Sequence, residues 1–215
     1  MGIMDILLVI HISAGFIALF SGVGASTVKQ WRGAHAWHQR WGNSFFFSMV
    51  VIFITAFPMA ALSQNFFLLF ISLFSMYFAY SGWRYAKNIT GRADKQDVFV
   101  LCLMVCVCIA MLFYGAFLWG TNDDGNGITL VAFSIIGFVA AGRNFITLRS
   151  GSAVGSQRIA EHATMMLAGC IATVTAFVVT NFTSDPVYLL WLLPTVVITP
   201  YIIYWNIFLL STQKK

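Results

Sequence analysis

The chain has 215 residues, of which 60% are hydrophobic and only 9% are charged. A soluble domain carries roughly 25% charged residues because water must solvate its surface, so this composition excludes an ordinary soluble protein and predicts a surface that faces lipid. The net charge of +5 does not indicate a nucleic-acid partner, because the basic residues fall at alternate ends of the apolar segments rather than on one recognition face.

Seven apolar segments are each long enough to cross a membrane, which takes about 20 mostly apolar residues. In chain order they are residues 4–28, 43–63, 65–87, 97–120, 128–148, 162–183 and 186–210. We therefore predict an all-α fold, with a single transmembrane domain over residues 1–215 in which seven helices form one bundle. The short link Ser63-Gln64-Asn65 predicts a tight hairpin between the second and third helices.

The charges of the loops predict the orientation in the membrane. The loops after the first, third and fifth segments and the C-terminal tail hold every Lys and Arg, when Arg84 and Arg143 are assigned to the nearer ends of their helices. The opposite side holds only acidic residues, which are Asp5, Asp123, Asp124 and Asp185. Because basic loops stay in the cytoplasm, we predict a multi-pass protein of the inner (plasma) membrane, with its N-terminus outside and its C-terminus cytoplasmic.

The first segment contains His11, about seven residues into the helix and so roughly 10 Å below the outer boundary. A stripe of small residues follows at a spacing of four, made of Ala14, Ala18, Gly22 and Ser26. Such a stripe permits two helices to approach closely, and we predict that His11 faces the interior of the bundle beside it. There the imidazole either packs against a hydroxyl or carbonyl, or serves as a cofactor ligand or proton site.

Two histidines at the predicted cytoplasmic face suggest a haem site. His38 is predicted to open the second helix and His162 to open the sixth, so both rings should lie at nearly the same depth. Two such imidazoles can ligate one iron, as of haem b, from opposite sides. Flanking arginines, among them Arg84, could hold the propionates, and Arg143 is a further candidate for cofactor binding.

The same face offers a different site, because His35, His38, Glu161 and His162 could together hold zinc or another divalent metal. A third interpretation is that these residues only cap helices and contact lipid headgroups. Arg143 is also open to two interpretations: it lies roughly 22 Å from the outer end of its helix, where it could snorkel to the inner boundary or pair with Glu161, Asp94 or Asp97.

Several short motifs resemble a known family. They are His11-Ile12-Ser13-Ala14-Gly15, His38-Gln39-Arg40-Trp41-Gly42, Asn65-Phe66-Phe67-Leu68 and Ser81-Gly82-Trp83-Arg84, with a looser similarity at Glu161-His162-Ala163-Thr164-Met165-Met166. Over the first 90 residues the chain resembles the small bacterial membrane proteins grouped as domain of unknown function 2306. The resemblance implies a polytopic inner-membrane protein with no assigned chemistry, and it draws attention to His11, His38 and Arg84. Gln39 departs from the family pattern, in which a basic residue is more usual.

Three classes of function remain open, and the sequence does not decide whether the protein is an enzyme. No P-loop, G-x-S-x-G, H-E-x-x-H or Rossmann motif occurs, which favours a transporter, sensor or accessory membrane subunit. The alternatives are a haem-binding redox protein and a metal-dependent membrane hydrolase. The expected partners are the lipid bilayer and either a second copy of the chain or another membrane subunit.

Overall fold

The computed structural model describes residues 2–28, 35–121, 124–151 and 153–211, and these residues form seven α-helices. The helices are α1 (Ile3–Val28), α2 (His35–Leu62), α3 (Phe66–Lys87), α4 (Lys95–Gly120), α5 (Asp124–Ser150), α6 (Gly155–Asn181) and α7 (Tyr188–Ser211). All seven contain a span long and apolar enough to cross a membrane. The predicted all-α bundle is confirmed, and the protein is an integral membrane protein.

Two helices begin about two turns earlier than the apolar segments predicted, α2 at His35 and α6 at Gly155. Hydropathy marks only the part of a helix that is apolar, whereas the backbone hydrogen bonds continue through polar turns at its end. His38 therefore lies one turn inside α2, and His162 lies about two turns inside α6. The prediction that these two histidines open their helices was wrong.

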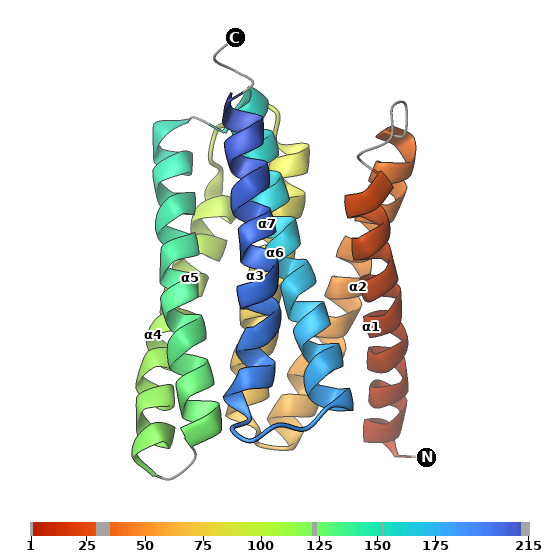
Figure 1. Cartoon of the computed structure of the whole chain (residues 1–215), viewed down its shortest axis with the longest axis vertical. Coiled ribbons are helices and arrows are strands. Elements are labelled where there is room, and N and C mark those ends of the chain that lie inside the picture. Colours follow the sequence, from red (N-terminus) through yellow and green to blue (C-terminus); the bar gives the residue numbers. More distant parts are fainter. Residues whose placement is uncertain (1, 29–34, 122–123, 152, 212–215) are drawn as a thin grey trace.

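Successive helices run antiparallel, with α3 and α6 in the middle of the bundle (Figure 1). The α4–α5 pair packs on one side of them, and α7 packs against α6. On the other side, α1 and α2 form a hairpin that contacts the remaining helices through α2 on α3 and α1 on α6. The molecule thus consists of a five-helix body, α3 to α7, and an N-terminal hairpin.

The described residues form two buried clusters. The larger cluster lies in the body and includes Phe74, Met104 and Leu130, from α3, α4 and α5. The smaller one joins the hairpin to α3 and is made of Ala18, Phe45, Phe46, Met49 and Ala79. The hairpin is therefore held to the body by a limited apolar contact rather than by the main core.

The small-residue stripe of α1 forms part of this contact. Ala14, Ala18 and Gly22 are buried, which confirms that this face packs against other helices. A Cβ atom on Gly22 would lie 2.8 Å from Cys170 Sγ on α6 and 3.2 Å from the Phe45 ring on α2. Only glycine allows the three helices to meet this closely.

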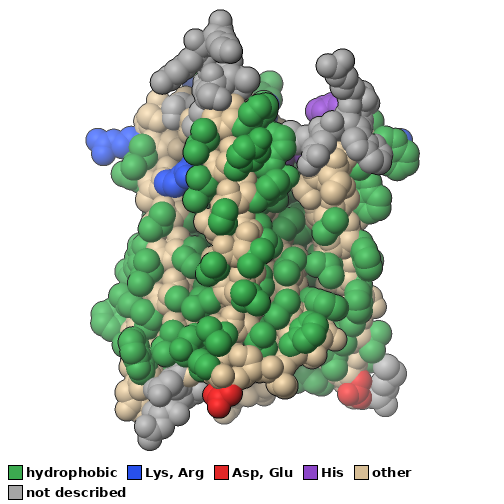
Figure 2. Space-filling view, viewed as in Figure 1, with side chains coloured by type: hydrophobic (Ala, Val, Ile, Leu, Met, Phe, Trp, Pro, Cys, Tyr) green, Lys and Arg blue, Asp and Glu red, His purple; other side chains and the backbone are tan. Residues whose placement is uncertain are grey.

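Hydrophobic side chains cover the visible flank of the molecule, while Lys and Arg lie near one end and acidic residues near the other (Figure 2). We call the end where α2, α4 and α6 begin the basic end; it is at the top of Figure 1. This end-to-end separation of charge is the arrangement that the loops predicted. Assignment of the basic end to the cytoplasm stays a prediction.

Candidate functional site

The side chains of His38 and His162 meet near the basic end. Their ring centroids are 6.1 Å apart, and the ring planes are inclined at 83°. Within the described part of the chain, the backbones of α2 and α6 make no contact with each other. The two imidazoles therefore reach toward one another across a gap between the hairpin and the body.

A backbone carbonyl orients each of these rings. Nδ1 of His38 lies 2.9 Å from the carbonyl oxygen of Ala25 on α1, and Nδ1 of His162 lies 2.8 Å from that of Gly82 on α3. A carbonyl oxygen can only accept a hydrogen bond, so both Nδ1 atoms donate. In a neutral imidazole the lone pair then sits on Nε2, which is the tautomer of a histidine that ligates a metal through Nε2.

The histidine pair borders a cleft between α1, α2, α6 and α7. The enclosed volume of the cleft is about 80 Å³, and the cleft is open on one side. The surface is hollowed between α7 and the hairpin at this level (Figure 2). Besides the two histidines, the cleft is lined by Gly22, Ala25, Ser26, Gly42, Phe45, Ala163, Met166, Leu167, Cys170, Tyr201 and Trp205. The lining is almost entirely apolar.

Small residues form part of one wall of the cleft. Gly22 and Ala25 on α1 and Gly42 on α2 present almost no side chain, and a Cβ atom on Gly42 would meet nothing within 4 Å. Aromatic side chains stand on the α7 wall, where Tyr201 and Trp205 lie 6.2 Å apart, ring to ring. The cleft thus has small residues on its hairpin side and aromatic rings on its α7 side.

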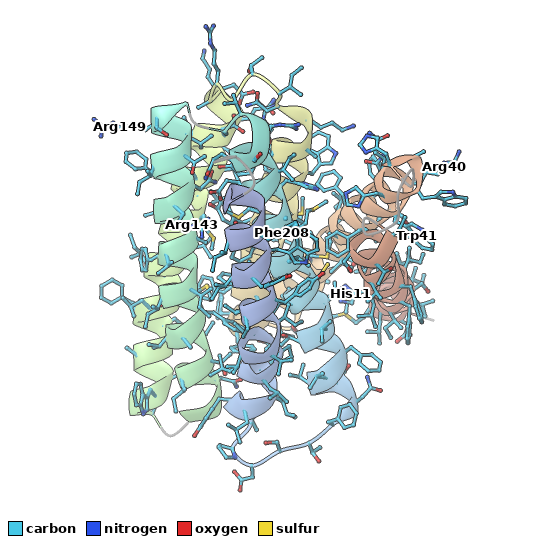
Figure 3. All side chains as sticks on the ribbon, turned by 45° about the horizontal axis from the view of Figure 1, so that its top comes forward. His11, Arg40, Trp41, Arg143, Arg149 and Phe208 are labelled. Carbon is cyan, nitrogen blue, oxygen red and sulfur yellow. The ribbon has the colours of Figure 1, made fainter. Side chains whose placement is uncertain are left out.

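Glu161, the residue before His162, is a buried carboxylate with 1% of its surface exposed. Its Oε1 accepts hydrogen bonds from Arg143 Nη2 at 3.2 Å and from Gln157 Nε2 at 2.8 Å. Its Oε2 has no hydrogen-bond partner among the residues described. Arg143 thus makes the predicted pair with Glu161, from its position on α5 (Figure 3).

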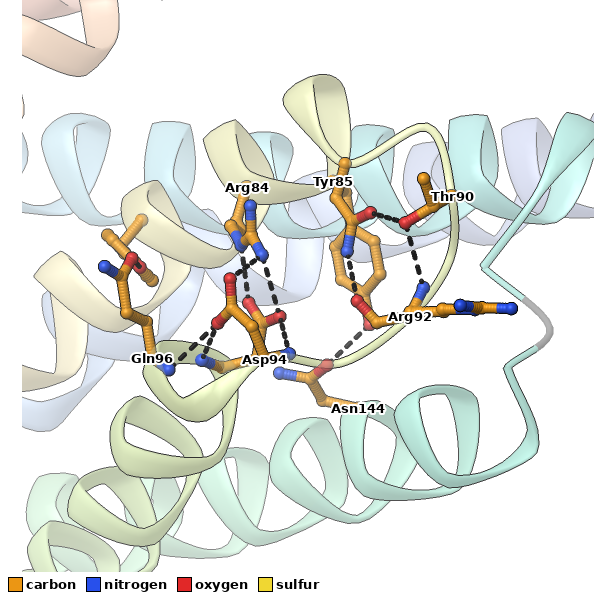
Figure 4. A network of polar contacts seen from close by, with 10 residues as sticks. Arg84, Tyr85, Thr90, Arg92, Asp94, Gln96 and Asn144 are labelled. Carbon is orange, nitrogen blue, oxygen red and sulfur yellow. Dashed lines mark hydrogen bonds and ion pairs between the residues drawn. The ribbon is translucent and has the colours of Figure 1, made fainter.

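Arg84 lies in a separate network that joins the end of α3 to the start of α4 (Figure 4). Its Nε donates to Asp97 Oδ1 at 2.8 Å, and its Nη2 pairs with Asp94. Asp94 caps α4 in a capping box with Asp97. The pKa of Asp94 is held below its usual range, first by the hydrogen bond from the Asp97 backbone and then by the charge of Arg84. Arg84 is engaged here and does not line the cleft.

A chain of buried polar groups in the body was missed by sequence reasoning. The Tyr85 hydroxyl donates to Asn144 Oδ1 at 2.5 Å, and Asn144 Nδ2 donates to the Tyr77 hydroxyl at 2.9 Å. Asn144 stands out in the sequence because it is an amide in an apolar segment. Its partners could not be predicted, because they are two tyrosines among many aromatic residues. The chain ties α3 to α5 beside the Arg143–Glu161 pair.

His11 lies away from the cleft, on the flank of α1 that faces α2. Its Nδ1 is 3.0 Å from the Thr55 hydroxyl oxygen, and that hydroxyl itself donates to the carbonyls of Val51 and Ile52. Thr55 therefore accepts a hydrogen bond from His11. The ring is half-buried, and its partner is a hydroxyl on α2, which is the packing role among the two that the sequence left open.

The four residues predicted as a metal site are not gathered at one point. His35 is exposed and contacts Gln39, whose Nε2 lies 3.1 Å from His35 Nε2. Glu161 is engaged with Arg143 and Gln157. Across the described ranges, no group of three or more His, Cys, Asp or Glu residues could hold one metal ion. Among the predicted site residues that the structure describes, His38 lies beside His162, and Arg143 pairs with Glu161.

Compared with protein-family models, with curated proteins and with solved structures, the chain gives no match. The resemblance to domain of unknown function 2306 therefore stays a prediction that rests on the quoted motifs.

Proposed function

We propose that this integral membrane protein binds one haem, that His38 and His162 would hold its iron, and that the haem would supply electron transfer. The observation that carries the proposal is the approach of the two imidazoles, with ring centroids 6.1 Å apart, from helices whose backbones do not touch.

The separation of the rings fits a shared iron. An iron bound by two imidazoles at about 2 Å each separates the two ligating nitrogens by about 4 Å, and the ring centres are then about 6 Å apart. The two Nδ1–H···O=C bonds also support the proposal, because ligating histidines usually donate their second ring nitrogen to a carbonyl or carboxylate. The donor set, the tautomer and the distance all agree with haem ligation.

The polarity of the surroundings also supports the proposal. The cleft is apolar, with the small residues Gly22, Ala25 and Gly42 on its hairpin side and Tyr201 and Trp205 on its α7 side. Haem iron supplies one-electron chemistry. His38 and His162 would both hold the iron, and the group would then supply electron transfer.

The test is an absorption spectrum of the protein purified from cells supplied with a haem precursor, together with metal analysis. We expect sharp α and β bands on reduction with dithionite and about one haem per chain. His38→Ala and His162→Ala should each lose these bands. His35→Ala is the matched control, because His35 is an exposed histidine on the same helix, and it should keep them.

Two results would overturn the proposal. One is a colourless wild-type protein after haem supply, which would leave the transporter, sensor or accessory-subunit interpretation. The other is a haem spectrum that survives in both histidine variants, which would place the ligands elsewhere. Stoichiometric zinc that is lost in these variants would instead indicate a divalent-metal site.

A further inference from the structure

Gly82 lies at a point where α3 and α6 approach each other very closely. A Cβ atom on Gly82 would be 2.8 Å from Met166 Cγ, 2.9 Å from Met166 Sδ and 2.9 Å from the Met166 backbone nitrogen. Contacts below 3.0 Å are too short for a real Cβ atom. The methionine side chain can move aside, but its backbone nitrogen moves only if α6 itself moves.

The same residue also binds His162. The carbonyl oxygen of Gly82 accepts the hydrogen bond from His162 Nδ1 at 2.8 Å. His162 and Met166 are four residues apart and therefore share one face of α6. A single residue of α3 thus contacts α6 in two ways, through its missing side chain at Met166 and through its carbonyl at His162.

Further contacts hold the start of α6 on the end of α3. Arg158 Nη1 donates to the carbonyl oxygens of Tyr85 and Ala86, both at 3.0 Å. Arg158, His162 and Met166 recur at a spacing of four along α6, and each faces the last turns of α3. Any widening between the helices at Gly82 would therefore move the His162 ring relative to His38 on the hairpin.

We propose that Gly82 is a positioning residue for the cofactor ligand His162. Its lack of a side chain sets the distance between α3 and α6, and its carbonyl sets the rotation of the imidazole. Together these two effects maintain the 6.1 Å separation from the His38 ring. The inference rests on the proposed function, because it assigns Gly82 a role in holding His162, a residue that would bind the iron.

The experiment compares Gly82→Ala with Gly142→Ala in titrations of haem-free protein with haem. Gly142 is the matched control, because it lies inside α5 and a Cβ atom there would meet nothing within 4 Å. We expect haem affinity to fall by about 10- to 100-fold in Gly82→Ala, as is typical when the partner of a ligating histidine is disturbed. Gly142→Ala should bind like the wild type.

Two spectroscopic readouts separate positioning from a loss of folded protein. At equal haem occupancy, Gly82→Ala should show changed low-spin electron paramagnetic resonance g values. It should also have a raised midpoint potential, because weaker hydrogen bonding at Nδ1 makes His162 a poorer electron donor to the iron. A residue that only aids packing would lower the yield of folded protein and leave the bound haem unchanged.

The double variant Gly82→Ala/Met166→Ala keeps the test decisive if the single variant does not fold. It removes two of the three close contacts, Met166 Cγ and Sδ, and should recover part of the haem affinity. Wild-type affinity, g values and potential in Gly82→Ala would overturn the inference while leaving haem binding intact. If only the double variant folds, wild-type affinity, g values and potential in it would overturn the inference as well, because the contact with the Met166 backbone nitrogen remains. Absence of haem from the wild type would instead reject the proposed function itself.

Discussion

In the Arg143–Glu161 pair, the carboxylate is buried and the guanidinium is about half exposed. The Glu161 side chain is 1% exposed, whereas that of Arg143 is 47% exposed. A guanidinium with half of its surface open can turn toward water or headgroups when its partner is removed. The buried carboxylate cannot reach water in this way. Removal of Arg143 and removal of Glu161 should therefore lower the free energy of unfolding by different amounts.

We predict that Arg143→Gln destabilises the protein by about 3–5 kcal/mol, because it leaves a buried carboxylate without its cation. Glu161→Gln should cost clearly less, since Arg143 can then reach solvent. The free energy of unfolding in detergent micelles, measured for both variants and for the double variant, checks this. Additive effects of the two substitutions would mean that the residues do not interact.

At the level of single residues, the sequence predicted the histidine pair but not the groups that orient it. His38 and His162 were recognisable because each is an imidazole at the end of an apolar segment. Ala25 and Gly82 contribute backbone carbonyls, and a carbonyl is present at every position, so no residue type indicates it. Arg84 was assigned to a cofactor because the chain after α3 gave no indication that Asp94 and Asp97 would fold back onto it.

At the level of helices, apolar length predicted all seven elements because only a helix can satisfy its own backbone hydrogen bonds in lipid. It failed at the beginnings of α2 and α6, where polar residues continue the helix beyond the apolar run. The spacing of small residues in α1 predicted a packed face, and Ala14, Ala18 and Gly22 are indeed buried. It did not indicate which helices would cover that face.

The packed face of α1 can be tested with Gly22→Leu. The new side chain would meet Cys170 and Phe45, and we expect a loss of about 1–3 kcal/mol, as is typical of overpacking. Gly15→Leu is the control on the same helix, because a Cβ atom at that position meets nothing within 4 Å. Thermal unfolding of the two variants should show a clear drop in midpoint for Gly22→Leu only. Equal midpoints would show that the close approach at Gly22 is unimportant.

At the level of the whole molecule, the separation of charge between the two ends predicts one orientation in the membrane. Basic loops are retained in the cytoplasm during insertion, so Lys95 and Arg158 should lie inside and the start of α5 outside. Cysteines introduced at positions 95, 126 and 158 can be labelled in intact cells with an impermeant thiol reagent. We expect rapid labelling at position 126 and none at positions 95 and 158 until the membrane is opened. Labelling of position 158 at the rate of position 126 would reverse the assignment.

The division into a hairpin and a five-helix body has a consequence for biogenesis. The hairpin is synthesised first and carries His38, whereas His162 enters the membrane only when α6 has been made. The body has its own buried cluster and meets the hairpin over a smaller one. The cleft between them therefore comes into being only when the two parts dock. A cofactor held there would have to be loaded after α6 has been translated, either when the two parts dock or when the hairpin opens later. A growing chain that does not yet contain α6 could not hold it.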